Sequence, residues 1–121
     1  MGKMQRTKGA KGELEFAHLC QEYGYTAVHR TAQHCGKTGQ AGDVEGLAGI
    51  HVEVKRTESL RLYDALNQSK RDCAAAGKNE IPIVAHRKNK SEWVVIMTAA
   101  DFFKMYKKYM ESSEDIEQEK I

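Results

Sequence analysis

The sequence contains little cysteine, a single proline and no long apolar run, and each scarcity narrows the classes of protein to consider. Its three cysteines are an odd number without CxxC spacing, which favours reduced thiols over a disulfide framework or a zinc site. There is no run of about 18 apolar residues and no charged, apolar leader, so we expect no membrane span and no secretory signal. No internal repeat is found. We therefore expect a cytoplasmic protein with one hydrophobic core.

The net charge of +2 conceals an uneven distribution of charge along the chain. Residues 111–121 carry five acidic side chains against Lys120, so residues 1–110 hold 18 basic and 12 acidic ones. We expect a single basic domain over residues 1–110 and a disordered acidic tail over residues 111–121. The first twelve residues contain no acid, and their basic side chains suit contact with nucleic-acid phosphates, with a solvated, frayed terminus as the alternative: Lys3, Arg6, Lys8 and Lys11.

Apolar periodicity predicts an α/β protein with a mixed sheet flanked by helices. Period-3.6 patterns predict helices over residues 12–23 and 62–76 and a final helix that begins after a cap at Thr98 and runs through 101–110. Period-2 patterns predict strands over residues 25–32, 43–47, 50–55, 81–86 and 93–97, with Pro82 at an edge or a strand start. The element order is αβββαββ, followed by a C-terminal helix.

The stretch from residue 42 to residue 56, GDVEGLAGIHVEVKR, places charge on a predicted hairpin. Glu53 and Lys55 point to one face of their strand, and a turn centred on Ala48 sets Asp43 opposite Glu53 with Cβ atoms roughly 5 Å apart. Two carboxylates this close favour a hard divalent cation such as Mg²⁺. The site suits phosphodiester hydrolysis, with Lys55 orienting or deprotonating the attacking water. The alternative is an exposed strand with surface salt bridges.

Other charged and aromatic residues each allow two interpretations. Glu13 lies on the flank of the first helix's apolar stripe, although it also suits the helix N-terminal dipole. Arg30 and Lys37 are candidates for phosphate contacts, or are exposed cations of a strand and a connecting loop. The final helix has more large apolar residues than one small core needs, which predicts a partner surface or, alternatively, packing on the sheet: Phe102, Phe103, Met105, Tyr106, Tyr109 and Met110.

The spacing of Glu13, Asp43 and the Glu53-Val54-Lys55 triplet resembles the PD-(D/E)xK nuclease superfamily. The stretches KGELEF, GYTAVHRTA, GDVEG, HVEVKR and IPIVAHRK are most similar to the archaeal-type Holliday junction resolvases and their viral relatives. The resemblance spans roughly residues 6–97. It departs from the family at Gly42, where the superfamily has proline, and residues 31–42 are hard to align.

The resemblance implies a restriction-endonuclease-like fold and a set of functional residues. Asp43 and Glu53 are expected to bind Mg²⁺, which Mn²⁺ can replace, while Glu13 completes the acidic cluster and Lys55 assists the nucleophilic water. Gln68 is a possible accessory residue, or faces solvent as Asn67 does. Arg56 joins the cations expected to contact DNA.

These observations predict a Mg²⁺-dependent endonuclease that resolves four-way DNA junctions as a homodimer, because a two-fold dimer brings identical sites to opposed strands. One alternative is another PD-(D/E)xK nuclease acting on duplex, flap or single-stranded DNA. A second alternative is a noncatalytic DNA-binding module.

Overall fold

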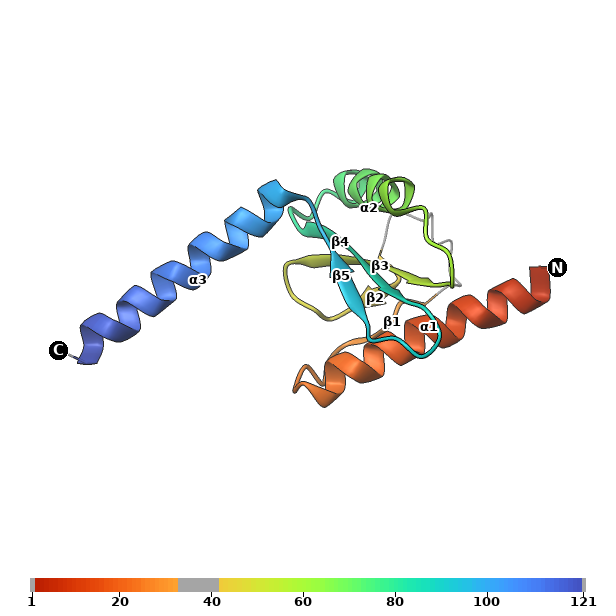
Figure 1. Ribbon diagram of the computed structural model, residues 1–121, viewed down its shortest axis with the longest axis horizontal. Helices are drawn as coiled ribbons and strands as arrows, with labels where there is room; N and C mark the ends of the chain where they lie inside the picture. Colours follow the sequence, from red (N-terminus) through yellow and green to blue (C-terminus); the bar gives the residue numbers. More distant parts are fainter. Residues whose placement is uncertain (1, 33–41, 121) are drawn as a thin grey trace.

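The computed structural model describes residues 2–32 and 42–120, and the side chains of residues 9–32 and 42–113. Its elements follow the predicted αβββαββ order with a C-terminal helix, which confirms the predicted α/β class (Figure 1). The elements are α1 (Gly2–Glu22), β1 (His29–Arg30), β2 (Val44–Glu45), β3 (Ile50–Arg56), α2 (Leu62–Ala76), β4 (Ile81–Arg87), β5 (Val94–Ile96) and α3 (Ala99–Lys120).

The five strands form one mixed sheet in the order β1-β2-β3-β4-β5. β1, β2 and β3 pair antiparallel, and β4 and β5 also pair antiparallel. β3 and β4 run parallel from Ile50 opposite Ile81 to Arg56 opposite Arg87, and α2 forms the crossover between them. Pro82 lies near the start of β4, before pairing with β5 begins at Val84, so its missing N–H interrupts no bond to β5.

The two faces of the sheet are covered by different helices. One buried cluster joins α1 to the sheet through Phe16, Ala17, Cys20, Val28, Val44, Val52, Ile83 and Ala85. A second cluster joins α2 to the other face through Ala65, Leu66 and Val84, with Leu60 and Ile96 packed against them. Because residues alternate between faces along a strand, the side of β3 that carries Glu53 and Lys55 faces α2.

α1 begins earlier than the predicted start at residue 12, and its close contact with the sheet depends on a glycine. A Cβ on Gly12 would lie 2.6 Å from Cβ of Arg56, so this turn of α1 passes β3 at a distance that a larger residue would not allow. Tyr23, the last residue of the predicted helix, lies beyond the end of α1 and is 76% exposed. β1 is shorter than its predicted strand and retains His29 and Arg30.

α2 has the predicted bounds and ends at Gly77, whose φ of 67° is the left-handed conformation that glycine adopts at a helix end. Cys20 and Cys73, for which reduced thiols were predicted, are free and buried. Burial raises the pKa of both thiols, Cys20 and Cys73, which keeps them protonated. Cys35 lies outside the described residues.

α3 projects away from the sheet and from the other helices (Figure 1). The backbone N–H of Asp101 donates to Oγ1 of Thr98 over 3.2 Å, which confirms the predicted cap. Residues 111–120, expected to form a disordered tail, have helical backbone here, in keeping with their content of the good helix formers Glu, Gln and Lys. Among the described residues, no helix is long and apolar enough to cross a membrane.

Candidate functional site

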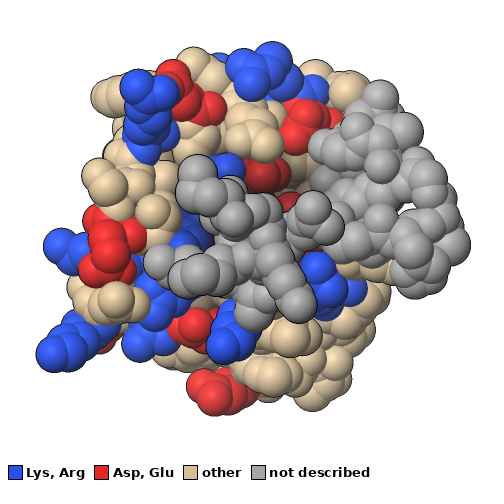
Figure 2. Space-filling model, turned by 90° about the vertical axis from the view of Figure 1, so that its right-hand side faces the viewer, with Lys and Arg blue, Asp and Glu red and all other residues tan. Residues whose placement is uncertain are grey.

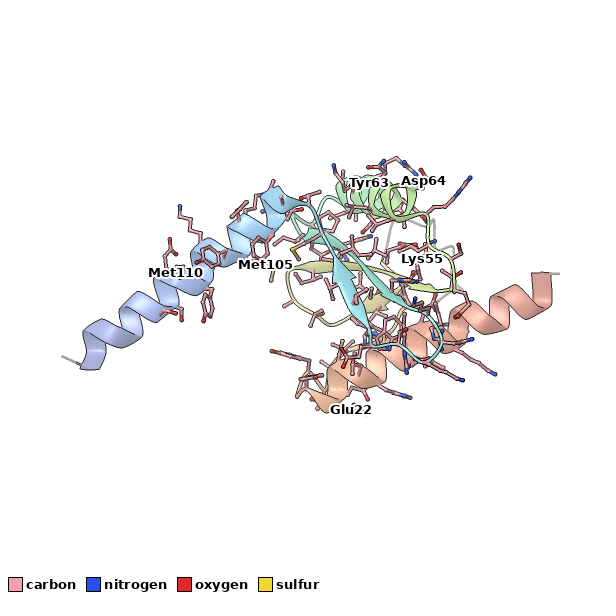
Figure 3. All side chains as sticks on the ribbon, viewed as in Figure 1. Glu22, Lys55, Tyr63, Asp64, Met105 and Met110 are labelled. Atoms are coloured by element: carbon pink, nitrogen blue, oxygen red, sulfur yellow. The ribbon has the colours of Figure 1, made fainter. Side chains whose placement is uncertain are left out.

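Glu53 is an acidic residue in the interior of the sheet, on the face covered by α2. It is 6% exposed, and its neighbour on the same face, His51, is 3% exposed. Lys55 comes next on this face and is partly exposed, so the row passes from the interior to the surface as β3 ends (Figure 3). A buried carboxylate is unstable without hydrogen bonds or a cation, so the surroundings of Glu53 decide what it can do.

Gln68 on α2 connects the two charged residues of β3. Its Nε2 donates to Oε1 of Glu53 over 3.1 Å, and its Oε1 accepts a hydrogen bond from Nζ of Lys55 over 3.3 Å. The amide therefore fixes the carboxylate and the ammonium group at the same time. Asn67 is exposed to solvent, as predicted. Gln68 is partly buried and forms this bridge.

Asp43 lies directly before β2 and is held there by hydrogen bonds of its own backbone and side chain. Its N–H donates to the carbonyl oxygen of Val52 over 2.7 Å, and its carbonyl accepts from the N–H of Thr31 over 3.0 Å. Its Oδ2 accepts a hydrogen bond from the N–H of Val54 over 2.8 Å. The carboxylate is thus fastened to the backbone between Glu53 and Lys55, which orients it before any ligand binds.

The hairpin register agrees with the turn expected at Ala48. Val44 pairs with Val52, and the next position along the same register sets Asp43 opposite Glu53. Gly42 precedes Asp43 in a crowded place, because a Cβ there would lie 2.9 Å from the carbonyl oxygen of Val52. The proline that the resemblance expects at this position would meet the β3 backbone, which explains why glycine replaces it in this chain.

Glu13 reaches the sheet from α1, on the face opposite α2. Its carboxylate forms an ion pair with Arg30 of β1, and its side chain is 13% exposed. Arg30, predicted to contact phosphate, therefore has a carboxylate partner within the protein. Glu13 is partly buried, as its place on the flank of the apolar stripe predicted.

The carboxylates of this site suit Mg²⁺ through the chemistry of their atoms. Within the described residues, no group of three or more His, Cys, Asp or Glu side chains is placed to enclose a metal ion. Mg²⁺ does not require such a cage, because proteins commonly hold it by one or two carboxylates and leave its other positions to water and substrate phosphate. Asp43 and Glu53 provide hard oxygen ligands of that kind, so the residues present fit a Mg²⁺ ion held by two carboxylates.

A groove of about 500 Å³ begins at Lys55 and Gln68 and continues along the start of α2. Two hydroxyl side chains, Thr57 and Ser59, and two arginines, Arg61 and Arg71, line it. Arg61 forms an ion pair with Asp64 at 3.8 Å, and the Arg61 side chain is 90% exposed. Figure 2 shows the end of the molecule where β3 stops and α2 begins. Lysine and arginine side chains are distributed over this end, with acidic side chains between them. The groove therefore offers donors for a phosphate backbone beside Lys55.

The cations predicted to contact DNA differ in their surroundings. The backbone of Lys3, Arg6 and Lys8 belongs to α1, but their side chains lie outside the described part of the chain, as does all of Lys37. Lys11 is exposed on α1. Arg56 is 17% exposed and pairs with Glu15 at 3.3 Å, so its guanidinium group is engaged inside the protein.

His51 lies two residues before Glu53 on the same face. Its Nε2 is buried without a hydrogen-bond partner among the described residues. Burial lowers the pKa of His51, so the neutral ring is favoured at this position. A neutral imidazole beside Glu53 adds no positive charge to the site.

The sequence left Gln68 open as an accessory or a solvent-facing residue, and it did not single out Arg61 or Arg71. The signal was present in the helical pattern, because Gln68 follows the buried Ala65 by three residues and Arg71 follows Gln68 by three. These positions share a side of α2 that borders the end of β3. The pattern alone did not show which strand lay beneath that side.

No family model and no curated protein matches this chain. Among solved structures, the chain is similar to Hjc of Archaeoglobus fulgidus, a Holliday junction resolvase from an archaeal hyperthermophile. The TM-score is 0.47 and the sequence identity 19%, over 69% of this chain and 74% of that chain. A likeness of this size does not establish an activity for this chain.

Proposed function

We propose that this protein is a Mg²⁺-dependent DNA endonuclease that cuts four-way junctions as a homodimer. The observation that carries the proposal is the bridge from Glu53 through Gln68 to Lys55, beside a second carboxylate, Asp43, fastened to the same strand. A buried carboxylate and an ammonium group held together at the mouth of a basic groove suit hydrolysis of a charged phosphodiester better than they suit a passive salt bridge.

Asp43 and Glu53 are the residues that would hold Mg²⁺. Glu13, which the family resemblance assigns to the acidic cluster, lies on the α1 side of the sheet, whereas the Glu53 carboxylate lies on the α2 side. When bound, Mg²⁺ supplies Lewis-acid stabilisation of the phosphodiester oxygens, and Mn²⁺ can supply the same chemistry. The Glu13 carboxylate is paired with the guanidinium group of Arg30. Glu13 could therefore bind the metal ion only if Arg30 moved away from it.

Lys55 has the role of positioning the attacking water and stabilising negative charge that develops on the phosphate. Its Nζ is held by Oε1 of Gln68, which limits the directions in which the flexible side chain can point. The same amide holds Oε1 of Glu53, so the separation between the carboxylate and the ammonium group is set by one rigid planar group. Gln68 acts through these two residues and is a positioning residue.

The groove beside Lys55 has the role of binding the DNA strand. Arg61 and Arg71 would contact phosphates, and the hydroxyl of Ser59 is an additional donor at the end nearer β3, whereas the hydroxyl of Thr57 donates to the carbonyl oxygen of Ser59 over 3.1 Å. Contacts of this kind place a strand across the reacting groups without reading its sequence. They support a nuclease whose selectivity rests on the shape of the DNA.

The choice of a four-way junction rests on the sequence resemblance to archaeal-type resolvases and on symmetry. A junction requires paired incisions in opposed strands, and a two-fold dimer presents two identical sites. Another nuclease of the superfamily, acting on duplex, flap or single-stranded DNA, would use the same residues. The substrate therefore has to be established by a direct comparison.

The experiment is to incubate the purified protein and Mg²⁺ with a four-way junction, a duplex, a flap and a single strand that share sequence. We expect paired cuts in the junction, little cutting of the other three, and no cutting in EDTA. Equal cutting of all substrates would retain the nuclease and remove the resolvase assignment. Absence of cutting with both Mg²⁺ and Mn²⁺ would favour the noncatalytic DNA-binding module.

A matched pair of variants tests the site itself. Glu53→Gln removes a carboxylate of the proposed metal site, and we expect it to abolish cutting while junction binding stays intact or becomes tighter. Glu45→Gln is the control, because Glu45 is an exposed acid of the same hairpin that lies on β2 and pairs with His29. Retained cutting by Glu53→Gln would contradict the proposed mechanism.

A further inference from the structure

The side chain of Thr31 is buried beside the hairpin that carries the candidate site. Thr31 follows β1 directly and is only 4% exposed, whereas most threonines lie at the surface. Its hydroxyl group donates to the carbonyl oxygen of Gly42 over 2.6 Å, and its backbone N–H donates to the carbonyl oxygen of Asp43 over 3.0 Å. Thr31 therefore holds two successive carbonyl groups of the segment that leads into β2.

The chain bends at Asp43, so the regular geometry of β2 does not extend to this residue. In a regular antiparallel sheet, a hydrogen-bonded residue exchanges both of its backbone bonds with the same partner. The N–H of Asp43 donates to Val52 of β3, whereas its carbonyl group accepts from Thr31, on the side of β1. The bend is therefore held by contacts from both neighbouring segments.

The peptide group between Gly42 and Asp43 is fixed at both of its polar atoms. Its oxygen accepts from the Thr31 hydroxyl, and its N–H donates to the carbonyl oxygen of Val52 over 2.7 Å. Rotation of this peptide plane would change φ of Asp43 and hence the direction of its Cα–Cβ bond. Glycine restricts such rotation less than any other residue, so the Thr31 hydroxyl supplies a constraint that position 42 lacks.

The carboxylate of Asp43 depends on the direction that this peptide group sets. Its Oδ2 accepts from the N–H of Val54 over 2.8 Å, which requires the Asp43 side chain to point toward β3. A metal ligand that is already oriented loses less conformational freedom on binding than one that the metal has to order. Groups that orient a ligand therefore contribute to metal affinity without contacting the ion.

We propose that Thr31 is a positioning residue for the candidate metal site. Its hydroxyl fixes the peptide group between Gly42 and Asp43, and this peptide group orients the Asp43 carboxylate beside Glu53. The inference rests on the proposed function, because it gives Thr31 a part in metal binding by these two carboxylates. A purely structural role, in which the buried hydroxyl only stabilises the fold, is the alternative that the experiments have to separate.

The first experiment measures the orientation of Asp43 without metal or DNA. Thr31→Val keeps the shape of the side chain and the backbone N–H but removes the hydroxyl. Amide hydrogen exchange is followed by NMR, and we expect the Val54 N–H to accelerate at least about tenfold more than the amides of β4, because its acceptor is no longer held. Equal acceleration of all these amides would reveal a general loss of stability and overturn the proposal, as would an unchanged Val54 rate.

Further variants separate the hydroxyl from the rest of the Thr31 side chain. Thr31→Ala also lacks the hydroxyl and should behave as Thr31→Val does, whereas Thr31→Ser keeps it and should retain the Val54 exchange rate. Thr98→Val is the matched control, because the Thr98 hydroxyl accepts from the N–H of Asp101 at the start of α3. Selective acceleration of the Val54 amide in Thr31→Ser or in Thr98→Val would contradict the role of the Thr31 hydroxyl.

The second experiment measures metal binding in the absence of DNA. Binding of Mn²⁺ is followed by electron paramagnetic resonance, and we expect its dissociation constant to rise about tenfold in Thr31→Val and to stay within about twofold in Thr31→Ser. Equal affinity of the wild type and Thr31→Val would overturn the role of Thr31 and leave the metal site in place. A wild type that binds no Mn²⁺ would instead contradict the proposed metal site and, with it, the part that Thr31 has in metal binding.

Discussion

Gln68 and Glu53 are joined across the interface between α2 and β3 by a 3.1 Å hydrogen bond from Nε2 to Oε1. The donor comes from the surface of a helix and the acceptor from the middle of a buried strand, so this bond ties helix position to carboxylate orientation. Lys55 donates to the other end of the same amide. Displacement of α2 would thus alter both charged groups together.

The first prediction concerns Gln68→Ala. Loss of the amide removes a donor to a carboxylate that is 6% exposed, and the groups that orient a metal ligand typically contribute 10- to 100-fold in affinity or activity. We expect the Mg²⁺ concentration for half-maximal cutting to rise by a factor of about 10 or more. The measurement is a Mg²⁺ titration of the cutting rate. Asn67→Ala, at the exposed neighbouring position, serves as control, and identical titrations for the two variants would remove the positioning role.

The second prediction concerns the groove beside Lys55. If Arg71 contacts a phosphate there, Arg71→Gln should weaken binding of every DNA by a similar factor and lower the slope of log affinity against log salt by about 1. Binding is measured by fluorescence anisotropy at several salt concentrations, without a divalent metal. Lys70→Gln is the matched control, because Lys70 is an exposed cation on the same helix that does not line this groove. An unchanged slope for Arg71→Gln would place the DNA elsewhere.

The elements of this fold that depend on local apolar periodicity could be predicted from the sequence. α2 has the predicted bounds, and the register with Val44 opposite Val52 follows from the turn expected at Ala48, because apolar spacing and glycine turns act over short distances. The length of α1 was not predicted, since residues before Gly12 have no apolar stripe. The charged groups of the site were identifiable as Asp43, Glu53 and Lys55 because they share one strand pair.

Contacts between elements that are distant in the sequence could not be predicted from apolar periodicity. The ion pair of Glu13 with Arg30 and that of Arg56 with Glu15 depend on where α1 crosses the sheet, and apolar periodicity does not fix that position. Glu15 is partly buried between two arginines, which apolar periodicity alone does not indicate. Similarly, the aromatic residues of α3 allowed either a partner surface or packing on the sheet, and only the structure shows that α3 projects from the body with these residues exposed.

The third prediction compares two glycines of α1. A Cβ on Gly9 would meet nothing within 4 Å, whereas a Cβ on Gly12 would lie 2.6 Å from Cβ of Arg56. Gly9→Ala should therefore stabilise the protein by roughly 0.5–1 kcal/mol through helix propensity. Gly12→Ala should destabilise it by roughly 1–3 kcal/mol, because the helix must move away from β3. Urea denaturation measures both, and equal effects would contradict the close approach of α1 to the sheet.

The last prediction concerns Glu15, which lies between two arginines. Arg56 and Arg87 are neighbours in the register of β3 and β4, and like charges in that position destabilise a sheet. Glu15 pairs with Arg56 at 3.3 Å and also with Arg87, so its carboxylate offsets their repulsion and attaches α1 to both strands. The three side chains are 17–33% exposed, so the interaction is only partly screened by solvent.

Glu15→Gln keeps the size of the side chain and removes its charge. Arg87 then loses this carboxylate partner, and Arg56 keeps the longer 3.9 Å ion pair with Glu58. We expect the free energy of unfolding to fall by about 1–3 kcal/mol, as measured with urea at low salt. Glu22→Gln, an exposed acid near the end of the same helix, should change it by less than about 0.5 kcal/mol. Because salt screens the repulsion between Arg56 and Arg87, the loss in Glu15→Gln should shrink in 1 M NaCl. A loss that is the same in both conditions would indicate that packing, and not charge, is what Glu15 contributes.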